Sequence, residues 1–228
     1  MSALLAGAAV LVALSGLLAG ASRLRRLGTI GPETARKAVH VGMGAICLPF
    51  PWLFGDVRAV MFLAAVAAGA LLMLRGLPIL RPAFGCALHD VRRRSYGELA
   101  YIAGIAILFA FAAGDALVYV IPVAVLTFAD PAAALVGMRC TRNRYATRDG
   151  SKSIGGSVAF FGTAAVCVTL PLLAAGRPGA VAAGVIAGAV LMLVEAWAWA
   201  GLDNLTIPLA GGILMRSLDG ALSLGGLR

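Results

Sequence analysis

Long apolar runs separated by short polar segments dominate this sequence. Seven runs of 16 to 25 residues contain no charged residue or a single one. A helix needs about 20 residues to cross a bilayer, and these runs are continuous, whereas barrel strands alternate apolar and polar residues. The pattern therefore predicts seven transmembrane helices. They cover residues 2–22, 38–55, 59–74, 99–114, 116–138, 153–176 and 178–202.

The C-terminal segment has a weaker pattern. Residues 204–227 are mostly apolar, but the pattern is interrupted by Pro208, Gly211, Gly212, Arg216 and Asp219. We expect either an eighth span or a re-entrant segment here. The predicted fold class is all-α, a polytopic integral membrane helix bundle that forms one transmembrane domain over residues 1–228.

Composition agrees with the membrane prediction. The chain is 61% apolar and 13% charged, with a mean hydropathy of +0.95. Soluble domains are about half apolar and about one quarter charged. Disorder and disulfide scaffolds are excluded by the same figures, and the four scattered cysteines give no zinc-binding pattern.

The net charge of +9 is distributed unevenly. Three alternate loops, those after the first, third and fifth runs, contain 15 of the 19 basic residues, and such loops are normally cytoplasmic. We therefore expect these loops in the cytoplasm and the N-terminus outside. The partners predicted for this charge are anionic membrane lipids and not nucleic acid. The 15 basic residues of these three loops are Arg23, Arg25, Arg26, Arg36, Lys37, Arg75, Arg81, Arg92, Arg93, Arg94, Arg139, Arg142, Arg144, Arg148 and Lys152.

Two acidic residues lie within apolar runs, and a third directly follows the seventh run. Asp130 precedes Pro131 in the fifth run, Glu195 lies near the end of the seventh, and Asp203 follows it. Charges in a span are costly and usually face a cavity, so these carboxylates are candidate metal ligands, and we expect them to converge in one cavity. The alternatives are an arginine partner for Asp130 and a helix-end turn at Asp203.

The segment 139–157 combines basic residues with three glycines just before the sixth run. Arginines, exposed backbone N–H groups and a helix N-terminus all favour phosphate. A basic loop that contacts lipid head groups is the alternative. The spacing is not that of a Walker loop.

Two further polar groups stand at the starts of runs. Arg36, Lys37 and His40 precede or open the second run, where they are candidates for a phosphate contact or for an interfacial anchor. Glu98 opens the fourth run, where it is either functional or a dipole-compensating residue. The G-x-x-x-G pairs Gly16/Gly20 and Gly184/Gly188 predict close helix packing.

Taken together, the polar segments resemble one family, the CTP-dependent lipid-alcohol kinases: dolichol, phytol and farnesol kinases and the yeast-type diacylglycerol kinase. The matching elements cover residues 36–209 in the family's order. Many members have Glu where this chain has Gly155. The elements are Arg36-Lys37-x-x-His40, Gly97-Glu98, Ala129-Asp130-Pro131-x-Ala133 with Gly137, Lys152-Ser153-x-x-Gly156-Ser157, and Glu195 with Asp203-Asn204-Leu205-Thr206-x-Pro208-Leu209.

The resemblance implies transfer of the terminal phosphate of CTP, or of another nucleoside triphosphate, to a polyprenol, a phytol-like alcohol or diacylglycerol. It also implies Mg²⁺ as cofactor and a bacterial plasma membrane with the site on the cytoplasmic side. Asp130, Glu195 and Asp203 would bind Mg²⁺. The catalytic residues would be Asp130, Glu98, His40 and Lys37. The nucleotide would be bound by Arg36, Arg139, Arg142, Arg144, Lys152, Ser153, Gly156, Ser157 and Asn204.

Two other functions remain open from the sequence. A phosphatidate cytidylyltransferase would use the same metal and nucleotide groups but attack the α-phosphate of CTP. A small membrane transporter would place its buried acids along a pathway, normally near the bilayer centre and with an internal repeat. The acids of this chain instead gather toward one side.

Overall fold

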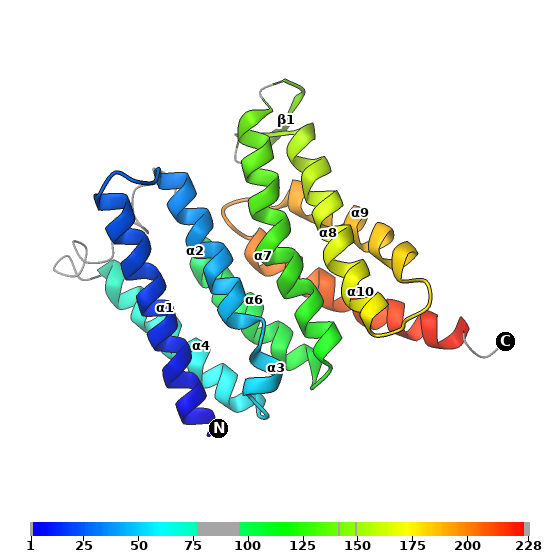
Figure 1. Cartoon of the computed structure of the whole chain (residues 1–228), viewed down its shortest axis with the longest axis horizontal. Helices are drawn as coiled ribbons and strands as arrows, with labels where there is room; N and C mark the ends of the chain where they lie inside the picture. Colours follow the sequence, from blue (N-terminus) through cyan, green and yellow to red (C-terminus); the bar gives the residue numbers. More distant parts are fainter. Residues whose placement is uncertain (1, 77–95, 141, 149, 226–228) are drawn as a thin grey trace. The chain divides into compact units, whose positions relative to one another are not determined.

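The protein is described by a computed structural model that covers residues 2–76, 96–140, 142–148 and 150–225 (Figure 1). The chain forms two compact units, Met1–Ser95 and Tyr96–Arg228. Apart from one short hairpin, the regular structure of the described residues is helical. This confirms the predicted all-α class, whereas a single domain over residues 1–228 stays a prediction.

The first unit contains α1 (Ala3–Arg26), α2 (Pro32–Cys47), the short α3 (Phe50–Leu53) and α4 (Val57–Gly76). Helix α1 packs along α2 and α4. Its last turn contains Arg23, Arg25 and Arg26, and basic side chains there complement the helix dipole. Helix α2 begins six residues before the predicted run because a proline is favoured in the first turn of a helix.

The second unit contains α6 (Gly97–Ala112), α7 (Ala116–Arg139), β1 (Arg144–Thr147), β2 (Gly150–Ser153), α8 (Ile154–Ala174), α9 (Ala180–Trp197) and α10 (Asp203–Gly225). Figure 1 shows α7 and α8 side by side, with the hairpin joining the end of α7 to the start of α8. Helix α9 packs along α8, and α10 contacts α6, α7 and α9.

Helices occur at all seven predicted positions within the described ranges, and five of them are long and apolar enough to cross a membrane. The five are α1, α4, α7, α8 and α9. Helices α2 and α6 have 16 residues each. The C-terminal segment forms one continuous helix of 23 residues, α10, despite Pro208 within it.

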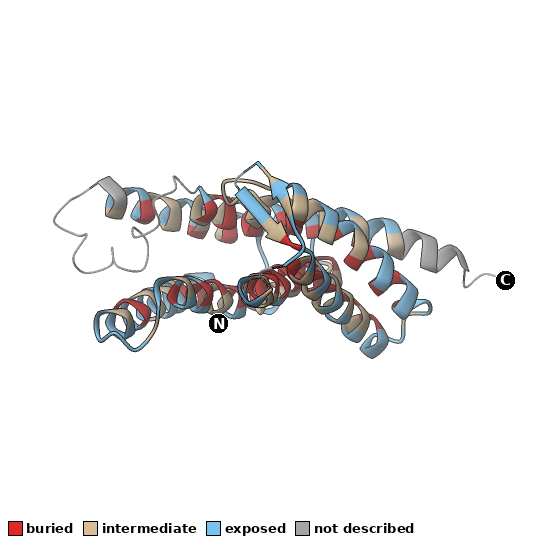
Figure 2. Cartoon of the chain, turned by 90° about the horizontal axis from the view of Figure 1, so that it is seen from above, coloured by how far each residue is buried: buried red, intermediate tan, exposed pale blue. Residues whose placement is uncertain are grey.

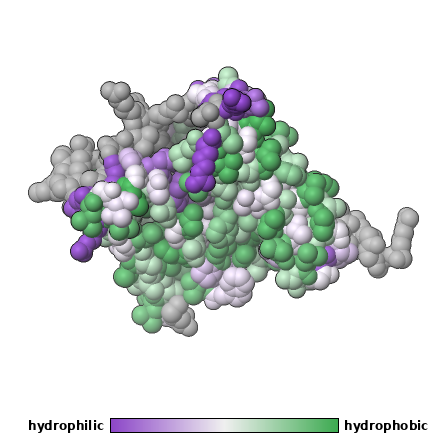
Figure 3. All heavy atoms as spheres, turned by 45° about the horizontal axis from the view of Figure 1, so that its top comes forward, coloured by the Kyte–Doolittle hydropathy of each residue, from purple (hydrophilic) through white to green (hydrophobic). Residues whose placement is uncertain are grey.

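Helix α7 is the core of the second unit. In the most apolar 18-residue stretch of α7, 56% of the residues are buried, whereas 22% are buried in that of α8. Figure 2 shows where buried residues lie along the chain, and Figure 3 shows mainly hydrophobic residues on the visible face. Large apolar side chains such as Val158, Leu170 and Leu193 are exposed on α8 and α9, as expected for surfaces that meet lipid.

Close packing by small residues is confirmed for only one of the two predicted pairs. A Cβ at Gly184 would collide with α8, at 2.8 Å from the Ala165 carbonyl oxygen, and a Cβ at Gly188 would lie 3.0 Å from the Phe161 carbonyl oxygen. By contrast, nothing lies within 4 Å of a Cβ built at Gly16 or Gly20. The packing prediction for Gly16 and Gly20 is therefore wrong for the described residues, because this spacing makes a smooth helix face without supplying a partner.

Candidate functional site

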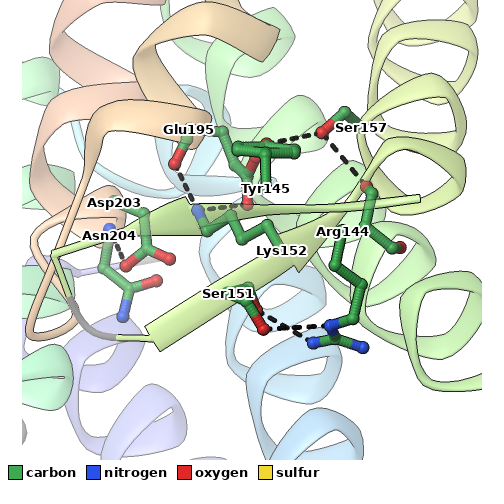
Figure 4. A network of polar contacts seen from close by, with 9 residues as sticks. Arg144, Tyr145, Ser151, Lys152, Ser157, Glu195, Asp203 and Asn204 are labelled. Atoms are coloured by element: carbon green, nitrogen blue, oxygen red, sulfur yellow. Dashed lines mark hydrogen bonds and ion pairs between the residues drawn. The ribbon is translucent and has the colours of Figure 1, made fainter. Parts of the chain in front are cut away.

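The basic segment after α7 folds as a two-stranded antiparallel hairpin and not as an irregular loop. Its register pairs Tyr145 with Lys152, which places both side chains on one face. The Tyr145 hydroxyl lies 2.8 Å from the Ser157 hydroxyl on α8 (Figure 4). The Asp-Gly dipeptide at 149–150 is a turn signal from which the hairpin was predictable.

Lys152 connects this hairpin to the end of α9. Its Nζ lies 2.6 Å from Glu195 Oε1 and also donates to the backbone carbonyl of Glu195 (Figure 4). A lysine that bonds a carbonyl in the last turn complements the negative end of the helix dipole. The Glu195 side chain is 8% exposed and that of Lys152 is 26% exposed, so this is a largely buried ion pair.

The three predicted acidic residues lie within electrostatic reach of one another. Asp130 and Asp203 both interact by like-charge repulsion with Glu195. We call Asp130, Glu195 and Asp203 the acidic cluster. Its members come from α7, from the end of α9 and from the start of α10, three helices of the second unit.

Asp130 is 8% exposed in the middle of α7. The next residue, Pro131, has no backbone N–H, so the carbonyl of Thr127 loses its usual helical donor. The Thr127 hydroxyl turns back to donate to the Val123 carbonyl at 2.6 Å. The helix thus continues through Pro131 with a locally altered hydrogen-bond pattern.

Asn204 fixes the start of α10 against the start of α6. Its Nδ2 donates to the Gly97 carbonyl at 2.9 Å, and the backbone N–H of Tyr96 donates to the Ala200 carbonyl at 3.1 Å. A side chain at Gly104 would collide with the Asn204 carbonyl, so the two helices also approach closely along their length. The half-buried Glu98 stands in this first turn of α6.

The start of α8 is shaped by close contact with α7. Ser153 is the N-cap, and its Oγ accepts from the Gly156 backbone N–H at 3.0 Å. A Cβ at Gly156 would lie 2.9 Å from the Ala133 carbonyl and 3.3 Å from the Cα of Gly137. The structure therefore uses Ser153 and Gly156 for capping and packing, and their predicted contact with a nucleotide stays a prediction.

The basic side chains of the segment lie around the hairpin. Arg144 donates to the Oγ and the carbonyl of Ser151 across the hairpin, both at 2.9 Å. The guanidinium of Arg148 lies 4.1 Å from the ring centroid of Trp199, in the α9–α10 connection. Arg139 and Arg142 are exposed. A second contact besides Lys152–Glu195 thus joins the hairpin to the chain around the acidic cluster.

The remaining predicted residues belong to the first unit. Arg36 is exposed and forms a bidentate ion pair with Glu33, with contacts of 2.6 and 3.0 Å. Lys37 and His40 are buried, at 5% and 6% exposure. Arg36 and His40 therefore differ in environment although they are one helical turn apart. Arg81, Arg92, Arg93 and Arg94 lie outside the described residues.

The acidic cluster is chemically suited to Mg²⁺, which prefers carboxylate oxygens and is usually held by one or two of them together with phosphates. Within the described part of the chain, no three His, Cys, Asp or Glu side chains are placed to hold a metal ion. Glu195 is paired with Lys152, and Asp203 Oδ1 accepts from the Asn204 backbone at 3.0 Å.

Comparison with known proteins connects these features to a family. A curated protein described as phytol kinase, from Synechocystis sp., is 33% identical to this chain over 208 residues, which cover 88% of this chain and 86% of the relative. No family model matches the chain, and no solved structure matches it. The chain belongs to the polyprenol and phytol kinase family, a class of membrane-embedded lipid-alcohol kinases.

Proposed function

We propose that this protein transfers the terminal phosphate of CTP to the hydroxyl of phytol or a similar long-chain isoprenoid alcohol. The observation that carries the proposal is the acidic cluster beside Lys152, at the point where the hairpin, α9 and α10 meet. Phosphoryl transfer requires positioning and charge neutralisation more than covalent chemistry by the protein. The similarity to a phytol kinase supports an isoprenoid alcohol as the acceptor.

The charged residues of the second unit would have two roles, since basic residues would bind phosphate and acidic residues would bind the metal ion. Lys152 and the exposed Arg139 and Arg142 supply positive charge for the triphosphate, and Asp130 and Asp203 would hold Mg²⁺. The metal ion would neutralise charge on the phosphate oxygens when it is bound. The alcohol oxygen attacks the γ-phosphorus, CDP leaves, and the hydroxyl proton passes to a carboxylate, for which Glu98 and Asp130 are the candidates.

The acceptor is a membrane lipid, so it would approach from the bilayer between the apolar helices. The nucleotide would approach from the cytoplasm, because the hairpin that we assign to it contains the positive charges of the fifth predicted loop. We also propose the bacterial plasma membrane as the location of the protein, because the similar phytol kinase comes from a bacterium.

The test uses the purified full-length protein in lipid nanodiscs. Labelled CTP, ATP and UTP are each supplied with phytol, farnesol, a polyprenol and diacylglycerol, with Mg²⁺ present. We expect the largest yield of lipid monophosphate with CTP and phytol. Equal yields from all donors would refute the choice of CTP, and phosphorylation of diacylglycerol alone would refute the choice of alcohol.

A further inference from the structure

The ammonium group of Lys152 is held within the acidic cluster. It bonds both the side chain and the backbone carbonyl of Glu195, whose side chain is 8% exposed. Asp130 and Asp203 interact with the same Glu195 carboxylate. A monovalent protein cation thus already offsets the charge of Glu195, one of the three carboxylates.

This contact competes with a divalent metal ion for the same carboxylate. A carboxylate oxygen that accepts a short bond from an ammonium is not available to a metal, and two cations at one carboxylate repel each other.

The side chain of Lys152 is partly exposed to solvent as well as bonded to Glu195. Lys152 lies on β2, whereas Glu195 belongs to α9, and its side chain is 26% exposed. A lysine carries a compact charge on a flexible four-carbon stem and can turn to a new acceptor. It stands directly before Ser153, the N-cap of α8, where a phosphate group would find a helix N-terminus as well as the ammonium.

We propose that Lys152 is a resident cation that keeps divalent metal ions out of the acidic cluster until nucleotide phosphates draw it away. Metal and nucleotide then bind together, and a metal ion alone binds weakly. The proposal rests on the proposed function, because the nucleotide site is part of that function, but the competition between Lys152 and a metal ion can be measured without any nucleotide.

The measurement is a Mn²⁺ titration of the purified full-length protein without nucleotide, followed by the electron paramagnetic resonance signal of free Mn²⁺. Removal of one nearby positive charge in Lys152→Gln should tighten Mn²⁺ binding by about tenfold or more. Lys152→Arg keeps a cation and should bind as weakly as the unmodified protein. Adding Asp203→Asn to Lys152→Gln should abolish the gain.

The matched control is Arg144→Gln, which removes the same charge from the same hairpin. The structure places the Arg144 side chain on Ser151 and not on the acidic cluster. Arg144→Gln should therefore leave Mn²⁺ binding unchanged. If Lys152→Gln is not monodisperse, Lys152→Met keeps the apolar stem of the side chain and replaces it in the experiment.

Two outcomes would overturn the inference: equal Mn²⁺ affinity in the unmodified protein and Lys152→Gln, or an equal gain in Arg144→Gln. The first outcome would mean that Lys152 is a fixed structural contact. The second would mean that Mn²⁺ affinity depends on the total charge of the hairpin and not on the position of Lys152. A protein that phosphorylates alcohols without a gain in Lys152→Gln contradicts this inference alone. A gain in Lys152→Gln without any kinase activity supports the competition and contradicts the proposed function.

Discussion

Lys152 and Glu195 are 43 residues apart in the chain, yet Lys152 Nζ lies 2.6 Å from Glu195 Oε1. The contact joins the hairpin between α7 and α8 to the end of α9. It holds together parts of the site that the order of the sequence keeps separate, and its energetic role can be measured directly.

Lys152→Met should lower the free energy of unfolding in detergent by about 1–3 kcal/mol, because it leaves the buried carboxylate of Glu195 without its lysine beside two other acids. The value is below that of a fully buried pair because Lys152 is partly exposed. Glu195→Gln in the Lys152→Met background should recover part of the loss, since the unpaired charge is gone. Strictly additive changes in melting temperature would argue against an energetic coupling of the pair.

Gly156→Ala should destabilise the protein by about 1–3 kcal/mol, since over-packing of a close contact forces a backbone shift. The new Cβ would lie 2.9 Å from the Ala133 carbonyl on α7. Gly162→Ala on the same helix is the matched control, because nothing lies within 4 Å of a Cβ there. It should be neutral or slightly stabilising. Melting temperatures that agree for the two variants would contradict the close α7–α8 contact.

Gly155→Ala should lower the melting temperature, because the new methyl group would collide with the side chain of Cys140. A Cβ at Gly155 would lie 2.6 Å from Cys140 Sγ and 3.1 Å from Cys140 Cβ. Cys140→Ala removes the sulfur but keeps the second contact, so it should rescue Gly155→Ala partly and not completely. Thermal melts of the two single variants and the double variant form the cycle. If Cys140→Ala gives no rescue, another contact limits the size of residue 155.

The position of the transmembrane helices was predictable from the sequence, whereas the contacts within the site were not. Apolar runs predict helices because backbone polar groups must be satisfied within the segment in lipid, and α7 and α9 form where expected. The ion pair of Lys152 with Glu195 depends on how three helices pack, which no local pattern specifies.

Local sequence patterns also did not predict which of the two glycine pairs packs against another helix. Gly184/Gly188 and Gly16/Gly20 have the same spacing, but among the residues that the structure describes only the first pair faces another helix closely. The acidic residues were found because a carboxylate in a span is costly and therefore conspicuous. The packing role of Gly156 and the contact of Arg148 with Trp199 were missed, because neither residue differs in type from many others in the chain.

The predicted topology can be tested with single cysteines in a background without natural cysteines. We expect Arg142→Cys to react with a membrane-impermeant maleimide only after cells are opened, and Arg177→Cys to react in intact cells. The two residues lie in connections on either side of α8, so one transmembrane helix should separate them. Labelling of Arg142→Cys from outside intact cells would refute a cytoplasmic site.

The position of the transferred label tests most directly whether this protein is a lipid-alcohol kinase that depends on Asp130. Purified protein receives CTP labelled at either the γ- or the α-phosphate, together with phytol and Mg²⁺. We expect γ-label in the organic phase, CDP in the aqueous phase, and at least about a hundredfold loss in Asp130→Asn, as is typical when a charged group that stabilises the transition state is removed. Asp115→Asn, at the other end of α7, is the matched control and should keep its activity because Asn also caps a helix well. Label that enters the lipid only from the α-position, with γ-label released as pyrophosphate, would contradict the kinase and indicate a cytidylyltransferase.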